Sequence, residues 1–177
     1  MKTFKKPFKQ FVLVIALGFI TTSTFSQTTL TDPEVASVAV VANQIDISYA
    51  EIAIERSTNK DILEFAKRMI TDHNAVIQQA VALVTKLSVT PKDNAVSMSL
   101  LDGATKTKKM LNNASNKDFD KMYIDNEVAY HKAVIAAIKD LLIPETDNAE
   151  LKSLLEEVLP ALEAHLGHAE MVQKGLK

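Results

Sequence analysis

The chain contains 177 residues, of which 47% are hydrophobic and 24% are charged, and its formal net charge is −2. It has no cysteine, which excludes a disulfide-supported fold, a thiolate metal site and a lipid anchor attached through a cysteine. Stability must therefore come from packing of the apolar residues.

The first 26 residues have the pattern of a secretory signal peptide. Four lysines precede an apolar stretch over residues 11–20, and small or polar residues lead to an expected cleavage site after Ser26. We therefore expect a mature domain over residues 27–177, located in the periplasm or secreted. An uncleaved membrane anchor is the alternative, although this apolar stretch of about ten residues falls short of the ~20 that span a bilayer.

Signal cleavage changes the charge of the chain, because it removes four of the 20 basic residues and none of the 22 acidic ones. The mature domain then has a net charge of about −6, which argues against nucleic acid and anionic membranes as partners. At about 150 residues it is large enough for one hydrophobic core. We expect no integral membrane span after cleavage. The sequence identifies no partner and is compatible with a homo-oligomer.

Beyond the signal, composition and hydrophobic periodicity predict helices, with few glycines or prolines and no convincing period-two alternation. The first helix is expected to begin with Asp32 as its N-cap and to end before Asn59. The second is expected over residues 60–88, with Thr58 and Asp61 forming a capping box at its start.

The second half of the chain predicts three further helices. A weaker helix is expected over residues 94–111, and a long one over residues 117–142, which Pro144 ends. The last is expected over residues 147–174. Pro160 lies inside it and should bend its axis, either aiming the next histidine or curving the helix around the core.

These patterns predict an all-α protein with four long helices. About thirty residues separate the second long helix from the third, whereas the other two connections are short. A long crossover at this position is typical of a ferritin-like four-helix bundle. The weaker helix would then be a short extra helix in the crossover between long helices two and three.

Three of the four histidines, His73, His131 and His165, occupy apolar-stripe positions on three different long helices. Burial of an imidazole costs free energy unless the ring has a partner. At a rise of about 1.5 Å per residue, Asp46, His73 and His131 lie within roughly 3 Å of their helix midpoints. His165 lies roughly 6 Å from its midpoint, an offset that a kink or a stagger could absorb. These four residues are candidate ligands of one divalent metal ion. Zinc suits them first, with copper, nickel and iron as alternatives.

Three further residues are candidates to support this site: Glu127, His168 and Tyr49. Glu127 precedes His131 by four residues, so its carboxylate could orient that ring. His168 lies one turn beyond the third candidate ligand, and Tyr49 lies on the inner face of the first helix. The alternative is three separate histidines, each hydrogen-bonded to a tyrosine, a carboxylate or a carbonyl group.

Three stretches of sequence resemble a known family: RMITDHN (residues 68–74), FDKMYIDNEVAYH (residues 119–131) and LPALEAHLGHAE (residues 159–170). With residues 45–57, they are similar to the bacterial exported ferritin-like domains called domain of unknown function 4142. The resemblance covers nearly all of the mature chain. It implies export, a helical bundle and polar core positions at Asp46, where the family usually has glutamate, and at His73, His131 and His165. It implies no established reaction.

The sequence departs from the ferritin-like di-iron proteins, which use two Glu-x-x-His pairs. The residues three positions before the candidate histidines are Ile70, Val128 and Leu162, so ferroxidase, oxygenase and iron-storage activities are disfavoured. Two hypotheses are favoured over a third, an oxidoreductase of the di-iron kind. One is a metal-binding bundle with a single mononuclear site. The other is a non-catalytic envelope bundle, acting in stress protection or partner binding, whose histidines form a hydrogen-bond network.

Overall fold

The structure is a computed structural model that describes residues 29–176, so the expected signal peptide over residues 1–26 lies outside the described part. The long helices are α1 (Asp32–Arg56), α2 (Lys60–Lys86), α3 (Ala95–Asn113), α4 (Asn116–Ala137) and α6 (Ala149–Gly175). A π-helical turn, η1 (Ile138–Leu142), and the short α5 (Ile143–Glu145) connect α4 to α6. Residues 29–176 contain no strand, which confirms the all-α prediction.

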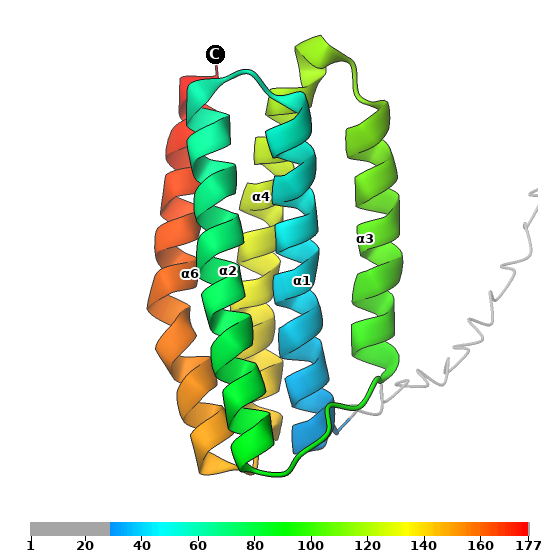
Figure 1. Ribbon diagram of the computed structural model, residues 1–177, viewed down its shortest axis with the longest axis vertical. Coiled ribbons are helices and arrows are strands. Elements are labelled where there is room, and N and C mark those ends of the chain that lie inside the picture. Colours follow the sequence, from blue (N-terminus) through cyan, green and yellow to red (C-terminus); the bar gives the residue numbers. More distant parts are fainter. Residues whose placement is uncertain (1–28, 177) are drawn as a thin grey trace, which may run out of the picture.

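The long helices lie side by side along one axis, with α3 on the outer side of α1 (Figure 1). Helices α1, α3 and α6 run in one direction, and α2 and α4 run in the other (Figure 1). The α3 helix therefore carries the chain back along the bundle between two helical hairpins, α1–α2 and α4–α6. The extra helix expected over residues 94–111 is present as α3, which has 19 residues and connects opposite ends of the bundle (Figure 1).

The start of α1 differs from the prediction by one residue. Thr31 is the N-cap, and the carboxylate of Glu34 accepts a hydrogen bond from the Thr31 backbone N–H at 3.0 Å. Asp32, the expected cap, instead accepts the backbone N–H of Asn148 at 3.1 Å. This contact joins the start of α1 to the start of α6, so the carboxylate satisfies a backbone donor on another helix.

Two other helix boundaries also differ from the prediction. Asn59, rather than Thr58, caps α2, because its Oδ1 accepts the backbone N–H of Asp61 at 2.9 Å. Pro144 does not end the helical path that starts with α4. The π-helical turn η1 precedes it, and Pro144 then lies in the first turn of α5, where a missing N–H is tolerated.

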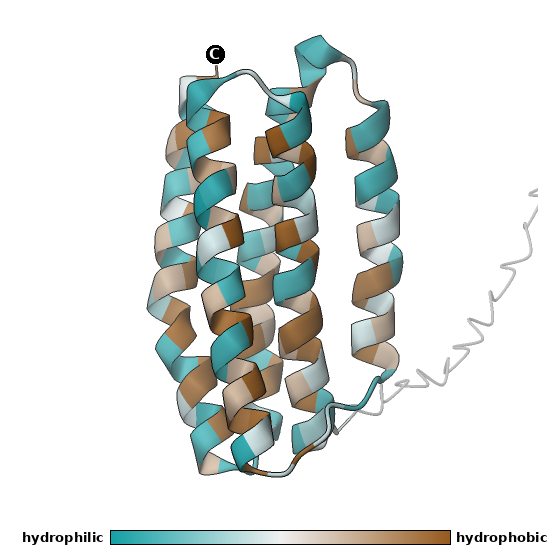
Figure 2. Cartoon of the chain, viewed as in Figure 1, coloured by the Kyte–Doolittle hydropathy of each residue, from teal (hydrophilic) through white to brown (hydrophobic). Residues whose placement is uncertain are grey.

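Hydrophobic and hydrophilic residues alternate around each helix, as amphipathic helices require (Figure 2). The buried apolar residues form two clusters. One cluster contains the aromatic side chains of Phe65, Phe119 and Tyr123, and the other is aliphatic. On α4 and α6, His131 and His165 lie between the residues of these two clusters. Within residues 29–176, no helix combines the length and hydropathy needed to cross a membrane.

Candidate metal centre

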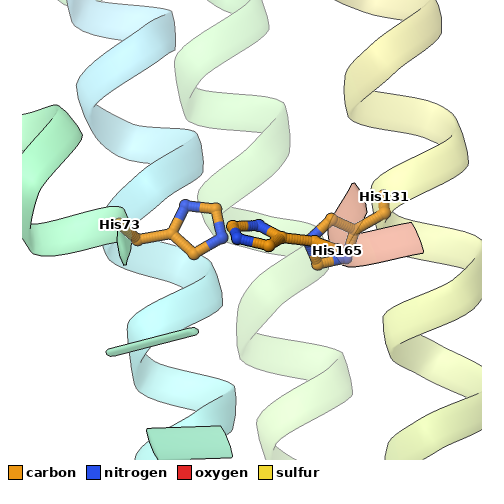
Figure 3. Close-up of side chains that lie close together, drawn as sticks. All are labelled: His73, His131 and His165. Atoms are coloured by element: carbon orange, nitrogen blue, oxygen red, sulfur yellow. The ribbon is translucent and has the colours of Figure 1, made fainter. Parts of the chain in front are cut away.

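Three histidines from three helices meet inside the bundle, with their rings turned toward one another (Figure 3). His73 lies on α2, His131 on α4 and His165 on α6, and each is at most 4% exposed. Their ring centroids are 5.3–5.9 Å apart. One ring nitrogen from each histidine lies within 4.8 Å of one from each of the others. The structure thus brings together the three candidate imidazoles, including that of His165, for which the sequence predicts an axial offset.

One nitrogen of each ring is hydrogen-bonded to the protein. The three contacts are His73 Nδ1 to Asn43 Oδ1 (2.7 Å), His131 Nδ1 to the Glu127 carbonyl oxygen (3.0 Å) and His165 Nε2 to Asp72 Oδ2 (2.8 Å). Each partner atom is an acceptor, so the ring nitrogen must be the donor. In a neutral imidazole the other nitrogen then keeps its lone pair.

The second nitrogen of each ring is buried and has no hydrogen-bond partner among the described residues. These atoms are His73 Nε2, His131 Nε2 and His165 Nδ1. Burial of an acceptor without a partner costs free energy, and the three rings that carry these atoms have centroids only 5.3–5.9 Å apart. Histidines that bind metals commonly show this arrangement, with the second ring N–H held by a carboxylate or a carbonyl oxygen. The three rings therefore have both the free donor atoms and the supporting contacts of a metal site.

Asp46 of α1 supplies a fourth potential ligand and is 1% exposed. Its Oδ2 lies 3.4 Å from His73 Nε2 and 3.6 Å from His131 Nε2, and neither carboxylate oxygen has a hydrogen-bond partner among the described residues. Zinc bonds to nitrogen and oxygen are about 2.0–2.2 Å long, so adjacent ligands of a tetrahedral ion lie about 3.3–3.6 Å apart. The separations of Asp46 Oδ2 from His73 Nε2 and from His131 Nε2 therefore match those between adjacent ligands of a tetrahedral zinc ion.

Burial keeps the three imidazoles neutral. Desolvation, with repulsion from His131 and His165, lowers the pKa of His73 to about 3. Desolvation also lowers the pKa of His131 to about 4 and shifts the pKa of His165 in the same direction. Because only the neutral imidazole binds a metal, these rings need lose no proton to do so at neutral pH.

Two buried carboxyl groups lie beside the imidazoles. Burial raises the pKa of Asp46 to about 8, and burial together with repulsion from Asp46 raises the pKa of Glu127 well above its usual range. Potential ligand atoms of Asp46, Glu127 and His131 lie within 4.8 Å of one another. Without a cation, Asp46 therefore holds a proton at pH 7, and a bound cation would take the place of that proton.

Glu127 contacts His131 mainly through its backbone. Its carbonyl oxygen is the hydrogen-bond acceptor at 3.0 Å, whereas carboxylate Oε2 lies 3.7 Å from the same Nδ1. We expected the side chain to orient the imidazole, and the peptide oxygen one helical turn away does so instead. The buried carboxyl group of Glu127 is thereby left beside Asp46.

The other two predicted supporting residues lie outside the three-histidine cluster. His168 is half-buried and packs edge-on against Phe65, with ring centroids 5.3 Å apart. Tyr49 is buried and packs edge-on against Tyr130 at 5.5 Å. These contacts are with aromatic rings rather than with the three imidazoles.

Sequence reasoning missed two hydrogen-bond partners, Asn43 and Asp72. Asn43 lies three residues before Asp46, so both side chains project from one face of α1, and this spacing could have revealed it. Asp72 is adjacent to His73 in sequence but binds His165 of α6. It also contacts an arginine at i−4, as an ordinary surface helix residue does, so only the tertiary structure reveals its role.

This fold and site define the class of protein. It is an all-helical protein with a buried cluster of histidines and carboxylates that could hold a metal ion. The chain belongs to the family described as Domain of unknown function (DUF4142), whose model matches residues 21–172. The resemblance carried by the three stretches of sequence is thereby confirmed. A search of curated proteins and a search of solved structures found no match.

Proposed function

We propose that this protein binds one transition-metal ion through His73, His131, His165 and Asp46. The observation that carries the proposal is the set of three buried ring nitrogens that keep lone pairs while the opposite nitrogens donate to protein acceptors. Asp46 adds an anionic oxygen at the separation of adjacent ligands.

Zinc is the ion that this donor set favours. Three imidazoles and one carboxylate match its tetrahedral preference, and copper, nickel and iron also bind imidazole. With all four protein ligands the site would be structural. If Asp46 does not coordinate, the fourth position is open and would support hydrolytic chemistry with zinc, or redox chemistry with copper or iron. The residues of the site do not indicate a substrate, and we assign no reaction.

Export and a ferritin-like arrangement are further parts of the proposal. The basic and apolar pattern of residues 1–26 supports a cleaved signal peptide and a periplasmic or secreted location. Two helical hairpins joined by the crossover helix α3 support the ferritin-like arrangement (Figure 1). The three histidines lack the Glu-x-x-His pairs of di-iron proteins, so one ion is proposed rather than two.

A non-catalytic envelope bundle, acting in stress protection or partner binding, is the second candidate. The polar residues lie between two apolar clusters, where a buried network could fix the alignment of the helices. Such a network is incomplete among the described residues, because Asp46 makes no hydrogen bond with His73 or His131. The unpaired atoms therefore favour the metal site.

Elemental analysis of protein purified without a histidine tag tests the metal proposal. We expect about one equivalent of a transition metal, and stabilisation of metal-depleted protein by added zinc, since a ligand selective for the native state must stabilise it. His131→Ala should abolish both effects. His168→Ala is the matched control, because this histidine lies outside the cluster. A metal-free protein whose melting temperature ignores zinc would support the second candidate.

A further inference from the structure

A cavity of about 510 Å³ extends from the histidine cluster into the aliphatic half of the bundle. We call it the chamber. Its wall follows residues 36–46 of α1, 72–84 of α2, 130–142 of α4 and η1, and 151–165 of α6. The volume falls within the ~300–1,000 Å³ typical of small-molecule sites. One coordinated metal ion does not account for a space of this size.

The wall of the chamber is polar at one end only. Its polar residues are the four proposed ligands together with Asn43, Asp72 and Tyr130, and the remaining wall residues are aliphatic. Eight of these are alanines, whose side chains occupy little space along the wall. The polar end therefore coincides with the metal site, and the rest of the chamber offers only apolar contacts.

The two halves of the bundle are filled differently. Phe65, Phe119 and Tyr123 are buried in the cluster on the other side of the histidines, where large aromatic rings occupy the interior. In the chamber half, the wall spans thirteen residues of α2, from Asp72 to Val84, or about 18 Å of helix. Apolar atoms along such a wall lack packing partners, and an apolar occupant of matching length would supply them.

The chamber also reaches the surface. Three of its wall residues, Ala75, Ala133 and Ala161, are exposed to solvent and come from α2, α4 and α6. Small side chains at these positions leave room for a molecule to enter between the helices. The chamber is thus an elongated apolar space with access from outside.

We propose that the chamber binds a long-chain monocarboxylate, with its hydrocarbon chain between the helices and its head group on the metal ion. The position of the head group rests on the proposed function, whereas binding of the chain depends only on the chamber. Three neutral imidazoles leave a divalent cation with two positive charges, and Asp46 neutralises one of them. The carboxylate of the bound molecule neutralises the second, and its oxygen would be a fifth ligand, a coordination number that zinc sites also reach.

Calorimetric titration with tetradecanoate, on zinc-loaded and metal-depleted full-length mature protein, tests the inference. Ala80→Leu places a larger side chain in the chamber wall, and Ala82→Leu places the same side chain on the exposed face of the same helix. We expect saturable binding that Ala80→Leu weakens about tenfold or more and that Ala82→Leu leaves unchanged. Acetate, which has the same head group without the chain, should not bind measurably.

The outcomes separate this inference from the metal proposal. Absence of saturable tetradecanoate binding, or binding that survives both Ala80→Leu and Ala137→Leu unchanged, overturns the chamber as the chain site. The second variant fills the wall from α4 and serves if the first does not fold. If both variants weaken tetradecanoate binding but the protein takes up no metal, the chamber is supported as the site of the hydrocarbon chain. The same result overturns the proposed metal site.

Discussion

Asp46 Oδ2 lies 3.4 Å from the unpaired Nε2 of His73 inside the bundle. A charged carboxylate–imidazolium pair would have its atoms about 2.7–2.9 Å apart. The longer separation agrees with a neutral ring, because burial lowers the pKa of His73 to about 3. Two groups held apart at the distance of adjacent ligands suit a shared cation better than direct contact with each other.

The first prediction concerns Asp46→Asn, which removes the anionic ligand and keeps the size of the side chain. Zinc affinity should fall by about ten- to a hundredfold or more, because three imidazoles alone must then hold the ion. Competition with a chromophoric chelator measures this change. Asp102→Asn, on the exposed side of α3, is the control and should leave the affinity unchanged. Equal affinities of the two variants would show that Asp46 is not a ligand.

The second prediction is a loss of stability of the metal-free protein as the pH rises. The pKa of Asp46 is 3.8 in the unfolded reference and about 8 in the folded protein. Between pH 3.8 and 8, the folded protein therefore binds more protons than the unfolded protein. The contribution of protonated Asp46 to the free energy of unfolding is complete below pH 3.8 and is lost as the pH rises through 8. The pKa of His73 is depressed from 6.5 to about 3, which gives the opposite trend only below pH 6.5.

Between pH 6.5 and 8, the metal-free protein should thus lose about 1.4 kcal/mol of stability per pH unit for each buried carboxyl group of this kind. Urea denaturation at several pH values measures the slope. Asp46→Asn should remove its share of the slope, because an amide does not titrate. A wild-type slope that persists in this variant would argue against a raised pKa for Asp46. Zinc binding to the wild type below pH 8 should also release a proton, detectable by calorimetry in two buffers.

The third prediction concerns Asn43, which accepts a hydrogen bond from His73 Nδ1 at 2.7 Å. In Asn43→Ala the ring loses the contact that fixes its tautomer and its orientation. Zinc affinity should fall by about ten- to a hundredfold, as for other residues that support metal-bound histidines. Asn74→Ala is the control, because Asn74 is exposed on α2 and its side chain bonds only to the carbonyl oxygen of Ile70 among the described residues. Equal loss in both variants would mean that Asn43 has no special role.

The sequence predicted the all-α class and the depth of the three histidines, because both follow from helical periodicity along each segment. His73, His131 and His165 occupy positions where the apolar stripe requires a buried side chain, so their burial follows from local spacing. Helix midpoints and the helical rise made convergence of their rings compatible with the sequence but left separate, individually hydrogen-bonded histidines as an alternative. Properties of single helices were therefore accessible from the sequence.

Contacts between helices were less accessible. Asp72 has the spacing of a surface residue on α2, and its bond to His165 depends on how α6 lies against that helix. The chamber was not predicted either. Alanines at inward positions, such as Ala80 and Ala137, continue an apolar stripe and do not reveal whether neighbouring side chains fill the space between them.

The fourth prediction concerns Arg56, which joins the end of α1 to the end of the crossover helix. Its guanidinium donates to the carbonyl oxygens of Leu111 and Ala114, the latter at 2.8 Å, and lies 4.7 Å from the centre of the Phe119 ring. Arg56→Met keeps much of the apolar stem but leaves both carbonyl groups without this donor. We expect a loss of about 2 kcal/mol in the free energy of unfolding, because each bond involves a charged donor in a half-buried position.

Urea denaturation measures this loss, with an unchanged m-value as evidence that the unfolding reaction is the same. Arg56→Lys should recover less than half of it, since one ammonium group cannot reproduce the two-pronged guanidinium geometry. Lys109→Met, on the exposed side of α3, is the control and should change stability by less than about 0.5 kcal/mol. If Arg56→Met behaved like this control, the hydrogen bonds to Leu111 and Ala114 would make no net contribution to stability.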